Sequence, residues 1–232
     1  MEFFAAASPG LEPLCLRELQ ALSLVAPEGR AAEGGVSFNG RLYDGYLANL
    51  CLRTANRVLM RIGAFTASNF FTLEKKLAAT PWELYLHPGQ PLRFNVTARH
   101  SRLYHSVAIA ERFQKAIDAR WAEAGVDPKP NESAALGQQI FIRVVDDHFA
   151  VSLDSSGESL YRRGLKKQVT AAPLRETIAA AMLILAGYSP PEPLVDPMCG
   201  AGSFSLEAAM RSHNIPAGWF RDFAFSGWPA FA

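Results

Sequence analysis

The segment of this sequence best suited to chemistry is an acidic residue followed closely by two glycines. The string VDPMCGAGSF places Asp196 shortly before Gly200 and Gly202. Glycine lets a backbone approach a ligand closely and adopt conformations that a Cβ would block, and a carboxylate accepts hydrogen bonds from an ammonium group. This combination suits a ligand that carries an amino acid better than it suits a bare pyrophosphate.

Two nucleotide-binding motifs are excluded at this loop. The dinucleotide fingerprint needs a third glycine where Ser205 stands, and no G-x-x-x-x-G-K-[ST] motif occurs anywhere in the sequence. NAD and ATP are therefore poor candidates. Because two glycines alone are also typical of an ordinary tight turn, the hypothesis depends on the elements around the loop.

The pattern around the loop predicts a strand, a glycine turn and a helix. PEPLVDPMCGAGSFSLEAAMRSH supplies all three, and a further helix is expected from about Pro173 to Gly187. This arrangement is the opening βα unit of a doubly wound α/β sheet, in which ligands bind beyond the carboxyl end of the strand, at the helix N-terminus. Glu207 is expected to be a helix-face residue with a local role.

Two α+β regions are expected before this unit. In residues 1–67, strands and helices alternate in the ferredoxin style, and the first helix is expected to open at Ser8 and Pro9. Residues 68–164 are expected to hold a half-buried strand at LRFNVTARH, a helix from about 105 to 125, and a hairpin that turns at Asp146 and Asp147.

The composition excludes several classes of protein. Of 232 residues, 49% are hydrophobic and 19% are charged, with a net charge of +1, which excludes disordered, collagen-like and coiled-coil chains. Three widely separated cysteines argue against a disulfide scaffold and a zinc ribbon, so no metal is expected. No targeting or membrane-spanning segment is evident, which favours a cytoplasmic protein without a membrane partner.

Positive charge is concentrated in two segments. Residues 93–120 hold six Arg and Lys against two acids, and residues 158–175 hold five against Glu158. Such local surfaces can bind a phosphate backbone, although solvated helix faces or, at Arg162 and Arg163, a charged strand edge would give the same pattern. The residues predicted to bind RNA are Arg99, Arg102, Arg112, Lys115, Arg162, Arg163, Lys166 and Lys167.

The longer string around the loop resembles a known family. LYRRGLKKQVTAAPLRETIAAAMLILAGY followed by PLVDPMCGAGSFSLEAAM is similar to the junction of THUMP-domain class I RNA methyltransferases of the UPF0020 family, where an RGxxxxxxxAPLxETxAA helix precedes a DPMCGSGTxxIEAA loop. The resemblance implies a ferredoxin-like domain at residues 1–67, a THUMP RNA-binding domain at 68–164 and the beginning of a Rossmann-like methyltransferase domain at 165–232.

The same resemblance implies S-adenosylmethionine as the cofactor. The positions that match the family's cofactor-binding segments are Asp196, Pro197, Cys199, Gly200, Gly202, Ser203, Leu174 and Thr177. Ala201 stands where the family usually has Ser, and Ser203 where it usually has Thr. These two differences weaken a side-chain hydrogen bond but leave the backbone of the loop unchanged. The implied reaction is methyl transfer to an exocyclic base amine, with guanine N2 of 23S rRNA favoured and tRNA as the other RNA partner.

The catalytic residues are expected beyond residue 232. A parallel sheet needs several more strands than residues 171–232 accommodate, and no [DN]PP[YFW] motif occurs, so an N-terminal portion of a longer enzyme is expected. The aromatic tail WFRDFAFSGWPAFA would be an aggregation hazard without a covering sheet. Two alternatives stay open: a noncatalytic THUMP RNA-binding fragment, and an adenine-N6 DNA methyltransferase, which would not need a THUMP module.

Overall fold

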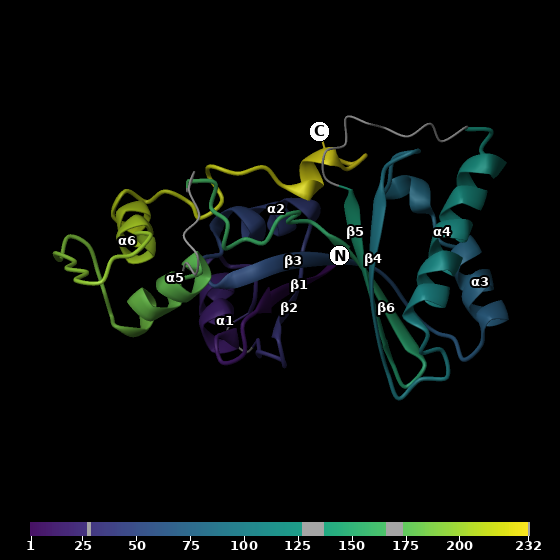
Figure 1. Cartoon of the computed structure of the whole chain (residues 1–232), viewed down its shortest axis with the longest axis horizontal. Coiled ribbons are helices and arrows are strands. Elements are labelled where there is room, and N and C mark those ends of the chain that lie inside the picture. Colours follow the sequence, from purple (N-terminus) through teal and green to yellow (C-terminus); the bar gives the residue numbers. More distant parts are fainter. Residues whose placement is uncertain (27–28, 127–136, 166–173, 232) are drawn as a thin grey trace. The chain divides into compact units, whose positions relative to one another are not determined.

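The computed structural model describes residues 1–26, 29–126, 137–165 and 174–231 (Figure 1). These residues form two compact units. The first unit combines residues 1–59 with residues 158–223, and the second combines residues 60–157 with the described residues from 224 onward. This grouping differs from the three consecutive segments expected from the sequence, because residues 158–223 fold together with the N-terminal region.

The first unit contains the predicted ferredoxin-like alternation of strands and helices. Its N-terminal elements are β1 (Glu2–Ala7), α1 (Glu12–Ala21), β2 (Gly35–Asn39), α2 (Leu42–Cys51) and the start of β3 (Ala55–Thr66). The strand order is β2-β1-β3, with β1 and β2 antiparallel. Phe3, Ala5 and Ala7 are buried and alternate with more exposed residues, the period of two of a strand with one covered face.

Helix α1 begins later than predicted. Ser8 and Pro9 lie in a turn, closed by a hydrogen bond from the Leu11 N–H to the Ser8 carbonyl at 2.9 Å. The helix starts at Glu12 and has Pro13 in its first turn. The predicted opening at Ser8 and Pro9 is therefore wrong; Pro13 occupies the first turn instead, where the missing N–H of a proline leaves no intrahelical hydrogen bond unmade.

The two helices predicted on either side of the glycine loop form, but the predicted strand does not. Helix α5 spans Glu176–Leu185 and helix α6 spans Ser203–Ser212. Residues 193–196 are irregular, and the Val195 side chain is 84% exposed. A strand exists only by hydrogen bonding to a neighbour, and no described strand pairs with this segment. The predicted βα unit is therefore present as a loop and a helix.

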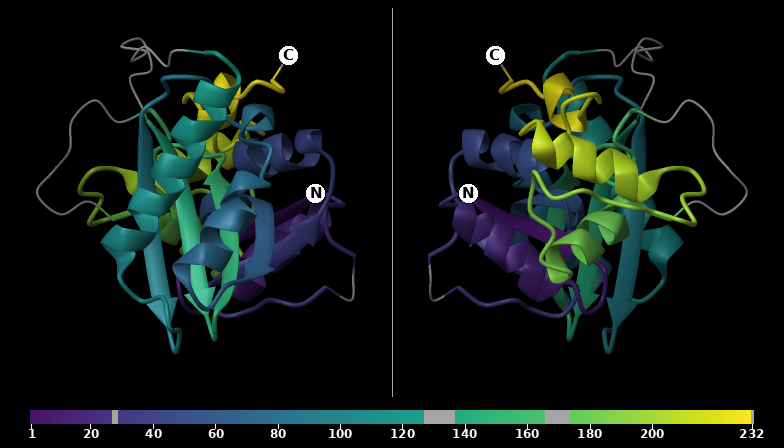
Figure 2. Two further views of the ribbon diagram at one scale, coloured as in Figure 1. Left: turned by 90° about the vertical axis from the view of Figure 1, so that its right-hand side faces the viewer. Right: turned by 90° about the vertical axis from the view of Figure 1, so that its left-hand side faces the viewer.

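The second unit is a sheet with helices on one face (Figure 2). Its elements are the end of β3, α3 (Phe70–Ala78), the 3-10 helix η1 (Trp82–Leu84), β4 (Leu92–Arg99), α4 (Ser106–Glu123), β5 (Gln138–Val145) and β6 (His148–Asp154). The strand order is β3-β6-β5-β4, with β4 parallel to β5 and β5 antiparallel to β6. The predicted hairpin turn is confirmed, since Asp146 and Asp147 have φ values of +50° and +62°.

Helix α4 determines which face of β4 is covered. Its buried stripe recurs every three to four residues and consists of Ile109, Phe113, Ile117 and Trp121. The Phe113 ring lies 6.1 Å from the ring of Phe94 on β4. Since alternate side chains of a strand point to opposite faces, Phe94 faces the helices and its neighbours Arg93 and Asn95 face away.

The aromatic tail is covered in part. Trp219 and Phe220 are exposed, but Phe225 and Trp228 are buried in the second unit. The Trp228 Nε1 donates a hydrogen bond to Gln138 Oε1 at 2.8 Å. The prediction that these aromatic side chains need cover is therefore met for two of them by the second unit.

The described residues were also searched for membrane spans and metal sites. No described helix is both long and apolar enough to cross a bilayer. Within the same residues, no group of three or more His, Cys, Asp and Glu side chains is arranged to hold a metal ion.

Candidate functional site

The glycine loop lies between α5 and α6 in the first unit (Figure 1). Gly200 and Gly202 have φ values of +50° and +72°, a region that residues with a side chain rarely adopt. A Cβ at Gly202 would meet no atom within 4 Å, and one at Gly200 would meet only the Met198 carbonyl at 3.9 Å. Glycine is therefore required here by backbone conformation, and the open space beside it leaves the backbone accessible to a ligand.

Asp196 provides a buried acceptor at the start of this loop. Its Oδ1 accepts a hydrogen bond from the Met198 N–H at 3.1 Å. Its Oδ2 is buried and has no hydrogen-bond partner among the described residues. A buried carboxylate oxygen without a donor is costly, so this atom fits a ligand that brings its own donor, such as an ammonium group.

The N-terminus of α6 provides backbone N–H donors a few residues after Asp196 in the sequence. Gly202 is the N-cap residue, and no side chain caps the helix. The first N–H groups of a helix have no partner within it and carry partial positive charge, which favours an anionic group. An acidic acceptor and uncapped N–H donors on one short loop are complementary in charge to the ammonium and carboxylate of an amino-acid moiety.

Two of the predicted cofactor-binding side chains form internal hydrogen bonds. The Ser203 hydroxyl, at the first position of α6, donates to the Leu174 carbonyl at 2.8 Å. The Thr177 hydroxyl donates to Asn56 Oδ1 at 3.2 Å, and Thr177 is fully buried. Ser203 therefore ties the loop to the start of α5, whereas Thr177 ties α5 to β3.

The other predicted loop residues lie at the surface. Pro197, Cys199 and Gly200 are exposed. By contrast, Cys15 on α1 is buried, and burial raises the pKa of its thiol to about 12. Cys199 is thus the exposed thiol among the three cysteines, and it can report on occupancy of the loop.

A buried ion network anchors α6. Glu207 is fully buried, and its Oε1 and Oε2 lie 2.8 Å from Arg163 Nε and 3.3 Å from Arg53 Nη1. Arg163 also donates to the carbonyls of Leu160 and Arg53 at 2.8 Å and 2.7 Å, and Arg53 donates to the carbonyl of Ile215. The network joins three segments: the residues between α2 and β3, the loop after β6, and α6.

A second, half-buried carboxylate supports the backbone beside Arg53. Glu18 on α1 accepts hydrogen bonds from the N–H groups of Arg53 and Thr54 at 3.0 Å and 2.9 Å, and from the Thr54 hydroxyl. Burial raises the pKa of Glu18, while these donors act in the opposite direction. Burial also lowers the pKa of Arg53, which Glu207 partly offsets.

The positions of Arg163 and Glu207 differ from the sequence prediction. The basic run predicts Arg163 at an RNA-binding surface, but the structure leaves it only 4% exposed, with its guanidinium engaged by internal acceptors. Glu207 was predicted to be a helix-face residue with a local role, but it lies at the centre of the buried ion network and pairs with both arginines. The matching carboxylate lies 44 residues from Arg163 in the sequence, so local charge counting could not find the pair.

Gly164 follows the network arginine and allows a close backbone contact. Its φ is +85°, and a Cβ there would overlap the carbonyl oxygen of Phe220. The neighbouring Arg221 guanidinium donates to the carbonyls of Glu158 and Ser159, each at 2.7 Å. The loop after β6 and the segment after α6 are therefore in direct backbone contact.

The remaining predicted RNA-binding residues fall into three groups. Arg102, Arg112 and Arg162 form ion pairs with Asp147, Glu74 and Glu158 at 3.7, 3.2 and 3.1 Å. Arg99 and Lys115 are exposed, on β4 and α4 respectively. Lys166 and Lys167 lie outside the described residues. Exposed ion pairs contribute little to stability, so the paired arginines can exchange their partners for phosphate.

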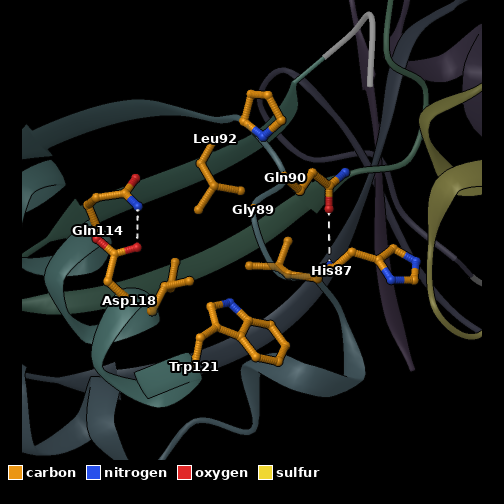
Figure 3. A pocket seen from close by; sticks show the side chains of 10 residues that line it. His87, Gly89, Gln90, Leu92, Gln114, Asp118 and Trp121 are labelled. Carbon is orange, nitrogen blue, oxygen red and sulfur yellow. Dashed lines mark hydrogen bonds between the residues drawn. The ribbon is translucent and has the colours of Figure 1, made fainter. Parts of the chain in front are cut away.

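A pocket of about 360 Å³ lies in the second unit, between α4 and the segment before β4 (Figure 3). Its apolar wall includes Leu92 and Trp121. Two of its polar side chains are joined, since Gln114 Nε2 donates to Asp118 Oδ1 at 2.8 Å. Unlike the glycine loop, the described lining of this pocket contains no buried side-chain polar atom that lacks a hydrogen-bond partner.

Comparison with protein families identifies two segments of the chain. Residues 2–59 match the model described as the RlmL ferredoxin-like domain, and residues 163–228 match UPF0020, described as an RMKL-like methyltransferase domain. Among curated proteins, the chain is 36% identical to a putative RNA methyltransferase, slr0064, of Synechocystis, covering 99% of this chain and 59% of that protein. It is 37% identical to the ribosomal RNA large subunit methyltransferase K/L of Syntrophotalea carbinolica, covering 98% of this chain and 32% of that protein.

Two solved structures are similar over nearly the whole chain. One, described as a predicted N6-adenine-specific DNA methylase from Listeria monocytogenes, has a TM-score of 0.87 and 30% identity and covers 100% of this chain and 60% of that one. The other, SMU.472, described as a putative methyltransferase complexed with SAH, has a TM-score of 0.85 and 33% identity and covers 99% and 60%. The chain thus resembles the ferredoxin-like domain of RlmL in its N-terminal region and an RMKL-like methyltransferase domain from Arg163 onward, while spanning less than two thirds of these relatives.

Proposed function

We propose that the glycine loop binds S-adenosylmethionine and that the protein containing this chain transfers the methyl group to RNA. The observation that carries the proposal is the buried, unpartnered Oδ2 of Asp196 beside the uncapped N-terminus of α6. The ammonium and carboxylate of the methionine moiety complement these groups. Further support is the similarity to SMU.472, solved as a complex with SAH, and to methyltransferases described as acting on RNA.

In this proposal the residues of the chain bind and orient the cofactor. Bound S-adenosylmethionine supplies an electrophilic methyl group. Asp196 would accept hydrogen bonds from the ammonium group, and the first-turn N–H groups of α6 would face the carboxylate. Gly200 and Gly202 would admit the ligand against the backbone. The [DN]PP[YFW] motif expected to orient the target amine does not occur in this sequence, so no residue of the chain is assigned that role.

The proposed substrate is an exocyclic amine of RNA, with guanine N2 of 23S rRNA as the specific target and residues 68–164 as a THUMP RNA-binding domain. A base amine is accessible only when its nucleotide is unpaired or flipped. The second candidate is adenine N6 of DNA, because a structurally similar protein is described as a DNA methylase. Methylation of ribosomal RNA transcripts and of duplex DNA by the protein containing this chain separates the two.

Replacing Asp196 with asparagine is expected to weaken the binding of S-adenosylhomocysteine by about 10- to 100-fold. The change keeps the shape of the side chain but removes the charge that would pair with the ammonium, and a hydrogen bond to a charged group contributes about 1.5–3 kcal/mol. Isothermal titration calorimetry of the chain measures this loss. Asp222→Asn is the matched control, since it removes the same charge from an exposed position of the first unit; equal affinities of both variants would contradict the proposal.

Bound S-adenosylhomocysteine is expected to slow the modification of Cys199 by Ellman's reagent. Cys199 is exposed on the loop, so a ligand seated there would shield its thiol. Cys15 is expected to stay unmodified in the folded protein, because its thiol is buried and its raised pKa of about 12 leaves almost no thiolate at neutral pH. Cys199→Ser should remove the ligand-sensitive phase. A modification rate that does not respond to saturating ligand would count against binding at this loop.

A further inference from the structure

We propose that the groove between the outer edge of β4 and α4, in the second unit, binds an extended peptide of a partner protein. The peptide adds a further strand to the sheet beside β4. It carries apolar side chains at alternate positions and an acidic side chain at each end. We call this groove the edge groove. Its binding is independent of the cofactor loop, and its partner is a protein rather than a nucleic acid.

Strand β4 leaves one row of backbone groups available to a further strand. It is the last strand of the sheet, and no described strand pairs with its outer edge. On the inner edge, the carbonyls of Pro91 and Arg99 accept hydrogen bonds, at 2.8 and 3.3 Å, from N–H groups at the start of β5 and just after its end. Because the backbone groups of successive residues point to opposite edges of a strand, those of Phe94 and Val96 point outward. Extended peptides bind to such a row by strand addition.

Two hollows lie along this outer edge, and α4 forms the other wall of both. The first is the pocket of about 360 Å³, whose walls include Leu92 of β4 and Trp121 of α4 (Figure 3). The second has a volume of about 390 Å³, and its walls include Phe94 of β4 and Val107 of α4. Leu92 and Phe94 are successive positions on the same face of β4, so the two hollows follow one another along the strand.

Both hollows lie on the flank of α4 that faces away from α3. The residues of this flank recur every three or four positions along the helix, and they are Val107, Ala110, Gln114, Asp118 and Trp121. On the opposite flank, Ala116 and Ala119 line a separate hollow together with Glu74 and Ala78 of α3. The edge groove therefore runs along α4, between its α3-free flank and the outer edge of β4.

The lining of the edge groove suits apolar side chains and not phosphates. Val107 is 70% exposed, and Phe94 and Val96 are only partly buried. The described lining of the two hollows includes the carboxylate of Asp118 but no lysine or arginine. A nucleic-acid backbone, whose affinity comes from contacts between phosphates and cations, would meet an acid here instead. A peptide strand would bury its alternate apolar side chains in the groove.

Two exposed arginines of β4 determine the charge of the peptide. Because Phe94 contacts Phe113 of α4, Arg93 and Arg99 point to the face of β4 that is turned away from the helix. They are six residues apart on the strand. A strand added beside β4 places alternate side chains of its own next to these positions, where opposite charges attract. The complementary peptide therefore spans seven residues, with acids at the first and seventh and apolar side chains at the second, fourth and sixth.

A second copy of the chain fits this edge less well than such a peptide. Two β4 strands that paired about a two-fold axis would bring the arginines of both copies onto one face, and a pairing centred on Val96 sets Arg93 opposite Arg99. Like charges directly opposite one another are destabilising, and charged side chains on edge strands commonly prevent self-pairing. An acidic peptide from another protein makes the same two charges attractive.

The test is fluorescence anisotropy of the chain at low salt with two labelled synthetic peptides, GELTVTLEG and GKLTVTLKG. The unmodified chain is expected to bind the first at least fivefold more tightly than the second, because two cross-strand charge pairs change from attraction to repulsion. The double variant Arg93→Glu, Arg99→Glu is expected to reverse this preference. Since the reversal compares two peptides on one protein, a misfolded variant cannot produce it.

Val107→Asp tests the apolar wall of the edge groove. An acidic side chain in the first turn of a helix is compatible with folding, but it places a charge where an apolar side chain of the peptide would be buried. Binding of GELTVTLEG is expected to weaken at least tenfold. The matched control is Ala119→Asp, an exposed position on the opposite flank of α4, which should bind as the unmodified chain does.

Methylation of the peptide backbone tests strand addition itself. In a strand pair, only alternate N–H groups of the peptide point to its partner. N-methylation of the central valine of GELTVTLEG and N-methylation of the threonine that follows it should therefore have opposite results. One of the two is expected to weaken binding at least tenfold, and the other is expected to change it by about twofold or less.

Several results would overturn the inference. These are no binding of GELTVTLEG by the unmodified chain, equal affinities for the two peptides, equal effects of the two aspartate substitutions, and equal effects of the two methylations. A single-stranded RNA that displaces the peptide and binds tenfold more weakly to Val107→Asp would assign the groove to nucleic acid. Dimerisation of the chain in sedimentation equilibrium that Val107→Asp abolishes would assign it to a second copy.

Discussion

Replacing Glu207 with alanine is expected to lower the free energy of unfolding by about 3–5 kcal/mol, because removing one partner of a buried ion pair leaves an uncompensated buried charge. Glu207 is fully buried and bonds to both Arg163 and Arg53. Arg163 has almost no exposure through which water could replace the lost carboxylate. Equilibrium urea denaturation of the chain measures the change as a lower midpoint.

The control for this prediction is Glu158→Ala. Glu158 forms an ion pair with Arg162 at 3.1 Å, but both side chains are about half exposed. Exposed pairs contribute about 0–1 kcal/mol, so this variant should unfold close to the unmodified chain. Similar midpoints for Glu207→Ala and Glu158→Ala would show that the buried network does not stabilise the first unit.

Replacing Gly164 with alanine is the second substitution with a large expected effect. Two penalties combine at this position: a side chain at φ +85° costs about 1–2 kcal/mol, and the overlap of its Cβ with the Phe220 carbonyl costs about 1–3 kcal/mol more. We therefore expect the free energy of unfolding to fall by about 2–5 kcal/mol, measured as above.

Gly187→Ala isolates the conformational part of this penalty. Gly187 ends α5 with φ +73°, and a Cβ there would meet no atom within 4 Å. Only the strain of the left-handed conformation remains, about 1–2 kcal/mol. If the free energy of unfolding fell equally in Gly164→Ala and Gly187→Ala, overlap with the Phe220 carbonyl would not contribute to the loss of stability.

The parts of the fold that sequence predicted are those with local signals. The helices on either side of the glycine loop follow from apolar periodicity, and the hairpin at Asp146 and Asp147 follows from its turn residues. The strand predicted just before the glycine loop is wrong because strand formation depends on a neighbouring strand, which a local apolar pattern cannot supply. The family matches support the ferredoxin-like region and the methyltransferase-like segment.

The candidate site was predictable to a similar extent. The acid and glycines of the loop could be proposed as a site from sequence because their residue types and spacing suit the binding of an amino-acid moiety. Arg163 was placed at the surface because a run of basic residues does not reveal which of them has a buried partner. Alternation along β4 places Arg93 and Arg99 on one side of that strand, but the position of Arg143 beside them follows from the register with β5, which is non-local.

The ion network limits how freely the two halves of the first unit can be exchanged between proteins. Arg53 belongs to the ferredoxin-like half, whereas Arg163 and Glu207 belong to the methyltransferase-like half. A chimera that takes residues 1–59 from a homologue lacking a cation at position 53 would retain a carboxylate with only one guanidinium partner. A homologue that donates residues 1–59 to such a chimera should therefore be chosen first for a cation at position 53, and only then for its overall sequence identity.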